Sequence, residues 1–80
     1  MNETEYRVIE LIREIGLTEI EHKDLTLIDD LGFDSLKLVM LLVMIEENFG
    51  IELDESDMDP YTLLTVEDVI RLVFRYVKEK

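Results

Sequence analysis

The stretch SLKLVMLLVMIEENFG, residues 35–50, constrains the fold most, because its apolar residues follow two helical stripes at once. The first stripe has the spacing of a core-facing helix side and contains Leu38, Leu41, Leu42, Ile45 and Phe49. The second contains Leu36, Val39, Met40 and Val43, and Glu47 continues it. At ~100° per residue the two stripes lie nearly half a turn apart, so a small bundle cannot bury both. We expect a helix over residues 35–48 with one apolar face at the surface.

Length and composition predict one small domain built from helices. The chain has 80 residues, of which 48% are hydrophobic and 8% aromatic, and it contains no cysteine. Its core must therefore come from Leu, Ile and Val, and neither a disulfide nor a thiolate metal site can hold the fold. We expect residues 1–80 to form a single domain.

Helical periodicity predicts two further long helices. The first covers residues 3–15, with Val8 and Ile12 in its core stripe and Gly16 as its stop. The last follows TVED, a capping box in which Thr65 and Asp68 satisfy each other's backbone N–H groups, and contributes Val69 and Val73 to the core.

The segments between the helices lack a clear period. Residues 17–34 read as a long loop, and loops of this length in compact domains are often functional. Residues 58–63 favour a short helix near Pro60. The predicted fold is all-α: a small antiparallel bundle of three main helices plus one short helix, with a long first loop.

Charge limits the possible partners. The formal net charge is −12, and no basic residue occurs between Lys37 and Arg71 although nine acids do. Nucleic acids and anionic membranes would repel such a chain, whereas basic protein surfaces would attract it. The longest apolar run, residues 38–45, is far shorter than the ~20 residues that span a bilayer. With no secretion signal at the start, we expect a cytoplasmic protein that does not insert into membranes.

Ser35 is the candidate functional residue, and three interpretations compete. It could simply cap the helix. It could be a nucleophile with His22 as base and Asp34 or Asp30 as orienting group, although GFDSL lacks the glycines of a nucleophile elbow. It could also be an attachment point, since a phosphate group is favoured at a helix start. The acidic run ELDESDMD lacks the turn glycine and bidentate glutamate of a calcium loop, so we expect no metal site.

The motifs DDLGFDSLKLVMLLVMIEENFGIEL and TVEDVIRLV resemble the acyl carrier proteins, and the likeness runs through the whole chain. The resemblance implies a carrier, not an enzyme, whose Ser35 bears 4′-phosphopantetheine with the cargo held as a thioester on its terminal thiol. It implies that Asp34 helps a phosphopantetheinyl transferase to engage the serine, with magnesium supplied in that complex. It assigns the partner-recognition face to Leu36, Val39, Met40, Val43, Glu46 and Glu47.

The chain departs from the pattern of fatty-acid carriers at Lys37 and Met40, where acids are common. The cargo therefore stays open between fatty-acid, polyketide and specialised biosynthesis, with an aminoacyl or peptidyl carrier as the alternative. A more remote alternative is an unmodified acidic helical adaptor. Expected partners are the transferase and acyl- or aminoacyl-loading and condensing enzymes with basic docking surfaces. We expect the protein to be a monomer.

Overall fold

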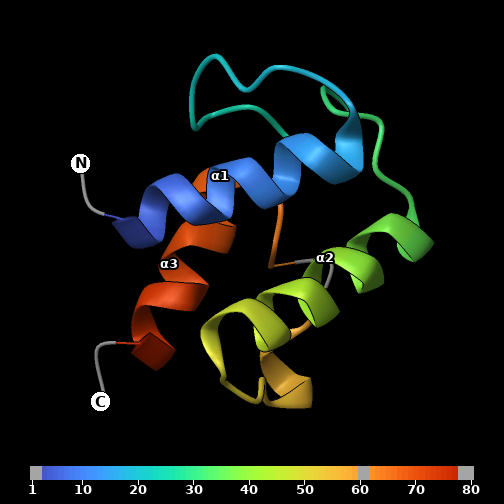
Figure 1. Cartoon of the computed structure of the whole chain (residues 1–80). Helices are drawn as coiled ribbons and strands as arrows, with labels where there is room; N and C mark the ends of the chain where they lie inside the picture. Colours follow the sequence, from blue (N-terminus) through green and yellow to red (C-terminus); the bar gives the residue numbers. More distant parts are fainter. Residues whose placement is uncertain (1–2, 60–61, 78–80) are drawn as a thin grey trace.

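The computed structural model describes residues 3–59 and 62–77. The secondary structure elements in this part of the chain are all helices. Its helices are α1 (Glu3–Gly16), α2 (Ser35–Phe49) and α3 (Val66–Val77), with a 3-10 helix, η1 (Glu55–Asp57), between α2 and α3 (Figure 1). The start of α1 meets the end of α2, where Arg7 Nη2 donates to Asn48 Oδ1 at 2.6 Å. The two helices therefore run antiparallel, and the predicted all-α bundle is confirmed.

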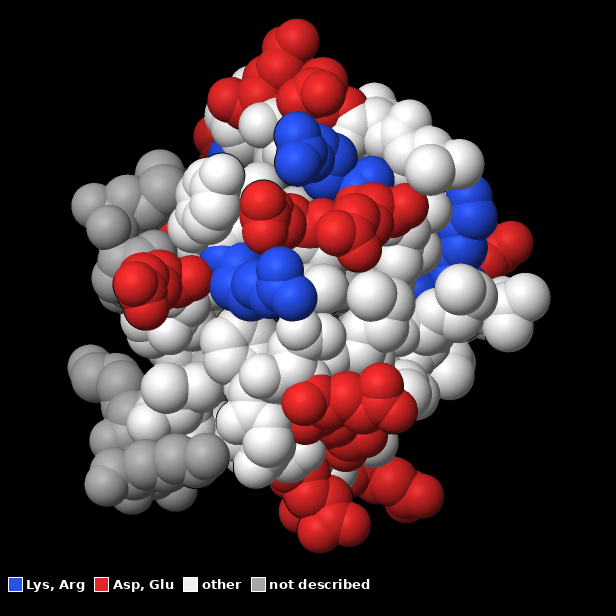
Figure 2. Space-filling model, in the orientation of Figure 1, with Lys and Arg blue, Asp and Glu red and all other residues white. Residues whose placement is uncertain are grey.

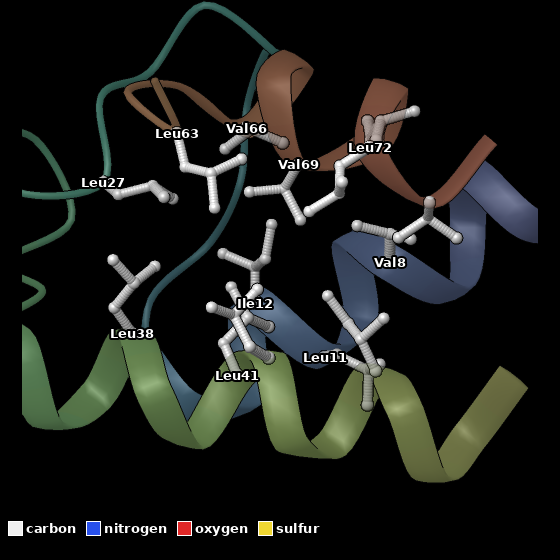
Figure 3. Packing of buried hydrophobic residues seen from close by; sticks show 14 of the residues in the cluster. Val8, Leu11, Ile12, Leu27, Leu38, Leu41, Leu63, Val66, Val69 and Leu72 are labelled. Atoms are coloured by element: carbon white, nitrogen blue, oxygen red, sulfur yellow. The ribbon is translucent and has the colours of Figure 1, made fainter. Parts of the chain in front are cut away.

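The core forms where α1, α2 and α3 face one another (Figure 3). Leu38 and Leu41 point from α2 toward the other two helices (Figure 3). The predicted core stripe is confirmed, because Leu38, Leu41, Leu42 and Ile45 are at most 8% exposed and Phe49 packs against them. The core positions predicted on α1 and α3 are also buried: Val8, Ile12, Val69 and Val73.

The capping box at the start of α3 is confirmed. The Asp68 N–H donates to Thr65 Oγ1 at 3.2 Å, and the Thr65 N–H donates to Asp68 Oδ2 at 3.0 Å. Asp68 Oδ2 also accepts from the Leu64 N–H at 3.0 Å, so one carboxylate satisfies two backbone donors before the helix begins.

The first helix ends at Gly16, as predicted, although the glycine does not take the left-handed conformation that commonly ends a helix. Gly16 is the last residue of α1, and Leu17 instead takes the left-handed conformation, with φ 55°. The glycine is needed for packing, since a Cβ at this position would lie 3.0 Å from Cε1 of the buried Phe33 ring. The close approach of the Phe33 ring is therefore a packing reason for a glycine at the last position of α1.

The short helical turn predicted over residues 58–63 is described only in part. Within this range the Asp59 carbonyl accepts from the Thr62 and Leu63 N–H groups at 3.0 and 3.1 Å, which closes a turn. The 3-10 helix η1 lies before this range and was not predicted; the Asp54 side chain caps it by accepting from the Ser56 N–H at 3.0 Å. Pro60 lies outside the described residues.

The long loop between α1 and α2 is ordered by bonds to the segment before α3. Thr26 and Thr65 form an isolated antiparallel bridge, flanked by hydrogen bonds from the Leu27 N–H to the Leu64 carbonyl at 2.9 Å and from the Val66 N–H to the Leu25 carbonyl at 3.0 Å. These bonds fix the loop that delivers the chain to the start of α2. No helix in the described part of the chain has the length and apolarity needed to cross a bilayer.

Candidate functional site at the start of α2

The approach to Ser35 is held in place by two buried loop residues. Leu31 and Phe33 are 8% and 3% exposed, and Gly32 between them has φ 73°, a conformation that favours glycine. The Phe33 N–H donates to the Leu27 carbonyl at 2.8 Å, which closes the turn. The chain then emerges at the surface, so Ser35 is exposed directly beside an anchored segment.

Asp34, and not Ser35, caps α2. Asp34 has extended backbone angles, and its Oδ1 accepts from the Lys37 N–H at 2.9 Å. Ser35 is the first helical residue, and its hydroxyl has no hydrogen-bond partner among the described residues. The interpretation of Ser35 as a simple cap is therefore wrong, and the hydroxyl is available for chemistry.

The second apolar stripe of α2 is at the surface, as predicted. Leu36 is 68% exposed, Val39 56%, Met40 46% and Val43 45%. We call these four residues the exposed α2 face. Contiguous exposed apolar residues of this kind mark interaction sites.

The two acids that follow this face differ in their surroundings. Glu47 is exposed. Glu46 is half-buried, and its Oε2 accepts from the Leu53 N–H at 2.8 Å. Glu46 thus holds the segment after α2 in place, whereas Glu47 presents its charge to solvent.

A narrow apolar cleft runs from Ser35 along one side of α2. Its volume is about 180 Å³, and its walls are Ser35, Leu38, Val39, Leu42, Val43 and Glu46 from α2, with Met58 opposite them. This volume is below the ~300–1,000 Å³ of drug-sized pockets, so the cleft suits a short apolar chain. Sequence reasoning did not find Met58, because its segment has no helical period.

The segment that carries Met58 is attached to α3 through Tyr76. The Tyr76 hydroxyl donates to Asp57 Oδ2 at 2.5 Å and accepts from the Asp54 N–H at 2.9 Å. Arg75 Nη2 also lies 3.2 Å from Asp57 Oδ1. The hydrogen bond to Asp57 raises the pKa of Tyr76, because it favours the protonated hydroxyl. The Met58 wall is therefore fixed relative to α3.

Within the described residues, no hydrogen bond joins Ser35 to His22, Asp34 or Asp30, the catalytic group considered from the sequence. Asp34 is used by the helix cap, and Asp30 Oδ2 accepts from the Thr26 N–H at 2.8 Å and the Thr26 hydroxyl at 3.1 Å. These bonds, with a smaller contribution from the charge of His22, lower the pKa of Asp30. His22 itself is exposed. Among the described residues, no cluster of three or more His, Cys, Asp or Glu could hold a metal.

The class of this small helical domain, with its exposed serine at the start of an apolar helix, follows from its likeness to known proteins. A family described as "Phosphopantetheine attachment site" matches residues 7–73, a range that includes Ser35. An acyl carrier protein from Nitratidesulfovibrio vulgaris is 37% identical over 71 residues, which cover 88% of this chain and 86% of the relative. One from Campylobacter hominis is 39% identical over 57 residues, which cover 71% of this chain and 70% of the relative.

The fold gives the same result. A solved Mycobacterium tuberculosis structure, proposed to be an acyl carrier protein, matches with a TM-score of 0.77 and 35% identity, over 88% of this chain and 93% of that one. The chain therefore belongs to the acyl carrier protein family, whose members carry 4′-phosphopantetheine and are carriers, not enzymes.

Proposed function

We propose that Ser35 carries the 4′-phosphopantetheine arm and that the protein holds acyl intermediates on it as thioesters. The main support for this proposal is the Ser35 hydroxyl, which is exposed at the first position of α2. It has no hydrogen-bond partner among the described residues, because Asp34 makes the cap. Residues 1–80 would act as one carrier domain, in the cytoplasm, for fatty-acid, polyketide or specialised biosynthesis.

Attachment follows ordinary phosphoryl-transfer chemistry. The Ser35 oxygen attacks the pantetheine-side phosphorus of coenzyme A, a P–O bond forms, and the bond to the departing adenosine 3′,5′-bisphosphate breaks. The serine proton passes to a base of the transferase, and magnesium in that complex stabilises the developing charge. Asp34 would help the transferase engage the serine from the adjacent position.

The surroundings of Ser35 supply the two other functions a carrier needs. The exposed α2 face, with Glu46 and Glu47 at its end, would be the surface that partner enzymes bind. The cleft of about 180 Å³ begins at Ser35 and is apolar along its length, so it would shelter a short acyl chain between enzymes. Transferase, loading and condensing enzymes with basic docking surfaces are the proposed partners.

The test is intact-protein mass before and after incubation with coenzyme A and a broad-specificity phosphopantetheinyl transferase. Wild type should gain one phosphopantetheine, and Ser35→Ala should gain none. The chain has one other serine, Ser56, whose Oγ donates to Asp54 Oδ1 at 2.9 Å, so Ser56→Ala is the matched control and should be modified like wild type. No gain on wild type, with an active control carrier, would favour the unmodified adaptor.

Cargo can be assigned by a second experiment on the modified protein. Because the chain has no cysteine, the arm supplies the one thiol that a thiol reagent can titrate. Incubation with acyl-activating and with aminoacyl-activating enzymes should consume this thiol only with the matching class. Loading by an aminoacyl-activating enzyme alone would make the protein an aminoacyl carrier.

A further inference from the structure

Lys37 differs from the other described Lys and Arg residues because its side chain forms no ion pair within the described part of the chain. The other described Lys and Arg side chains each pair with a carboxylate at 3.1–3.8 Å, namely Arg7, Arg13, Lys23, Arg71 and Arg75. No ion pair in the described part of the chain involves Lys37, although the protein has a net charge of −12. An ion pair within the fold therefore does not explain this residue.

Helix electrostatics do not explain Lys37 either. It is the third residue of α2, and the first turn of this helix contains no acid. A cation near a helix N-terminus is unfavourable, because the exposed backbone N–H groups already give that end a partial positive charge. The Asp34 carboxylate lies at this end of the helix, but it accepts from the Lys37 backbone N–H, and no ion pair in the described part of the chain involves the Lys37 ammonium. Residues that go against such a local rule tend to serve a function.

Lys37 is half-buried, and its position on α2 places it beside the surface that a partner would cover and not beside the arm. Residues two apart on a helix do not face each other, so Lys37 does not point toward an arm attached to Ser35. Residues three apart are neighbours, which places Lys37 beside Met40 at the edge of the exposed α2 face. A macromolecule that covers this face would meet the Lys37 ammonium at its rim.

The rim of this face carries opposite charges at its two ends. Lys37 and the exposed Glu47 are ten residues apart, or about 15 Å along the helix at ~1.5 Å per residue. The Debye length at 0.1 M salt is ~10 Å, which is shorter than this separation. A docked partner therefore interacts with the positive charge of Lys37 and the negative charge of Glu47 separately. The order of the two charges along α2 distinguishes one docking orientation from the reverse one.

We propose that Lys37 is a specificity-determining residue that pairs with a carboxylate on the enzyme that loads the arm. That enzyme would present an apolar surface to the exposed α2 face, with the carboxylate at the Ser35 end and a basic group at the Glu47 end. The charge order sets the orientation of docking and disfavours enzymes with a basic group at the Ser35 end. This inference rests on the proposed attachment of the arm to Ser35.

The test compares loading kinetics of fully modified wild type, Lys37→Glu and Arg71→Glu, using the activating enzyme that consumes the arm thiol. Arg71 is an exposed cation on α3, so its reversal changes the net charge equally at a site away from α2. We expect Lys37→Glu to lower kcat/KM about tenfold at low salt, because like charges then face each other, and less at high salt. Arg71→Glu should stay near wild type.

A compensating variant completes the test. Replacing a carboxylate of the loading enzyme by lysine should restore loading of Lys37→Glu and impair loading of wild type. Equal effects of Lys37→Glu and Arg71→Glu, or no effect of either, would overturn the role of Lys37. Because modification is verified by mass first, these outcomes differ from failure of the proposed function, in which wild type gains no arm and the inference falls with it.

Discussion

Asp34 and Ser35 are adjacent but have different roles at the start of α2. The Asp34 carboxylate satisfies the Lys37 N–H, one of the backbone donors that every helix start leaves open. Ser35 is thereby spared the capping role that its residue type would otherwise suit. The arrangement leaves a hydroxyl exposed on a fixed backbone, which is what a modifying enzyme needs in a substrate.

Substitution of Asp34 should separate its structural role from its proposed role in modification. Asp34→Ala should lower stability by about 1 kcal/mol, whereas Asp34→Asn should keep the cap, because asparagine is an equally good cap. We expect Asp34→Asn to melt near wild type yet to be modified more slowly, since it lacks the charge. Thermal melts and initial rates of modification measure the two effects. An Asp34→Asn protein that is modified at the wild-type rate would remove Asp34 from transferase recognition.

The helix α2 has a core side and an exposed side that a matched pair of variants can distinguish. Leu42 is 4% exposed, so Leu42→Ala should cost about 2–5 kcal/mol through lost burial and the cavity left behind. Val43, the next residue, belongs to the exposed α2 face, and Val43→Ala should change stability by less than ~0.5 kcal/mol. Denaturant unfolding measures both. Comparable losses of unfolding free energy in the two variants would mean that Val43 is buried in solution and that the exposed α2 face is not free.

The contact between η1 and α3 should have a signature at alkaline pH. The pKa of Tyr76 is raised above its ordinary value mainly by the hydrogen bond to Asp57. A raised folded-state pKa means that the contribution to stability is complete below the unfolded-state pKa and is lost as pH rises through the folded-state pKa. Wild type should therefore melt higher than Tyr76→Phe at neutral pH, and this difference should shrink as pH rises beyond about 10. A difference that is constant with pH would contradict a role for the hydroxyl proton.

The sequence predicted the helices well and the loops poorly, for a physical reason. Helical residues reveal burial through their spacing, so α1, α2, α3 and their core stripes could be predicted. The loops contribute core residues that no period marks: Leu27, Leu31, Phe33, Leu53 and Leu63. The η1 position also escaped, although Asp54 two residues before Ser56 is a recognisable capping pattern.

Across the whole molecule, charge is unevenly distributed. Figure 2 shows acidic side chains at the top, across the middle and in the lower part of the view, and only the lower group has no basic side chain beside it; Figure 1 places the end of α2 and the segment with η1 there. The predicted acidic stretch between Lys37 and Arg71 covers this part of the chain. Such a field attracts basic protein surfaces at a distance and is weakened by salt.

The rate of modification should therefore fall as ionic strength rises. We expect initial rates with the transferase to decrease between about 0.05 and 0.5 M sodium chloride, because the Debye length shortens severalfold over this range. Circular dichroism at each salt concentration controls for unfolding. A rate independent of salt would assign recognition to the exposed α2 face alone.

The sequence indicated which residues form the candidate site, but not the contacts that leave the Ser35 hydroxyl exposed. Ser35 and the apolar residues after it could be identified from spacing and resemblance. The cap by Asp34, the inward bond of Glu46 and the Met58 wall depend on contacts between segments, which spacing does not encode. These contacts explain why the serine is available and where a short chain can lie.

Attachment of the arm to the Ser35 oxygen can be tested by fragmentation mass spectrometry of the modified protein. We expect the added phosphopantetheine mass in every fragment that contains Ser35 and in no fragment that contains Ser56 alone. An added mass on Ser56, or on a fragment without either serine, would show that Ser35 is not the attachment point.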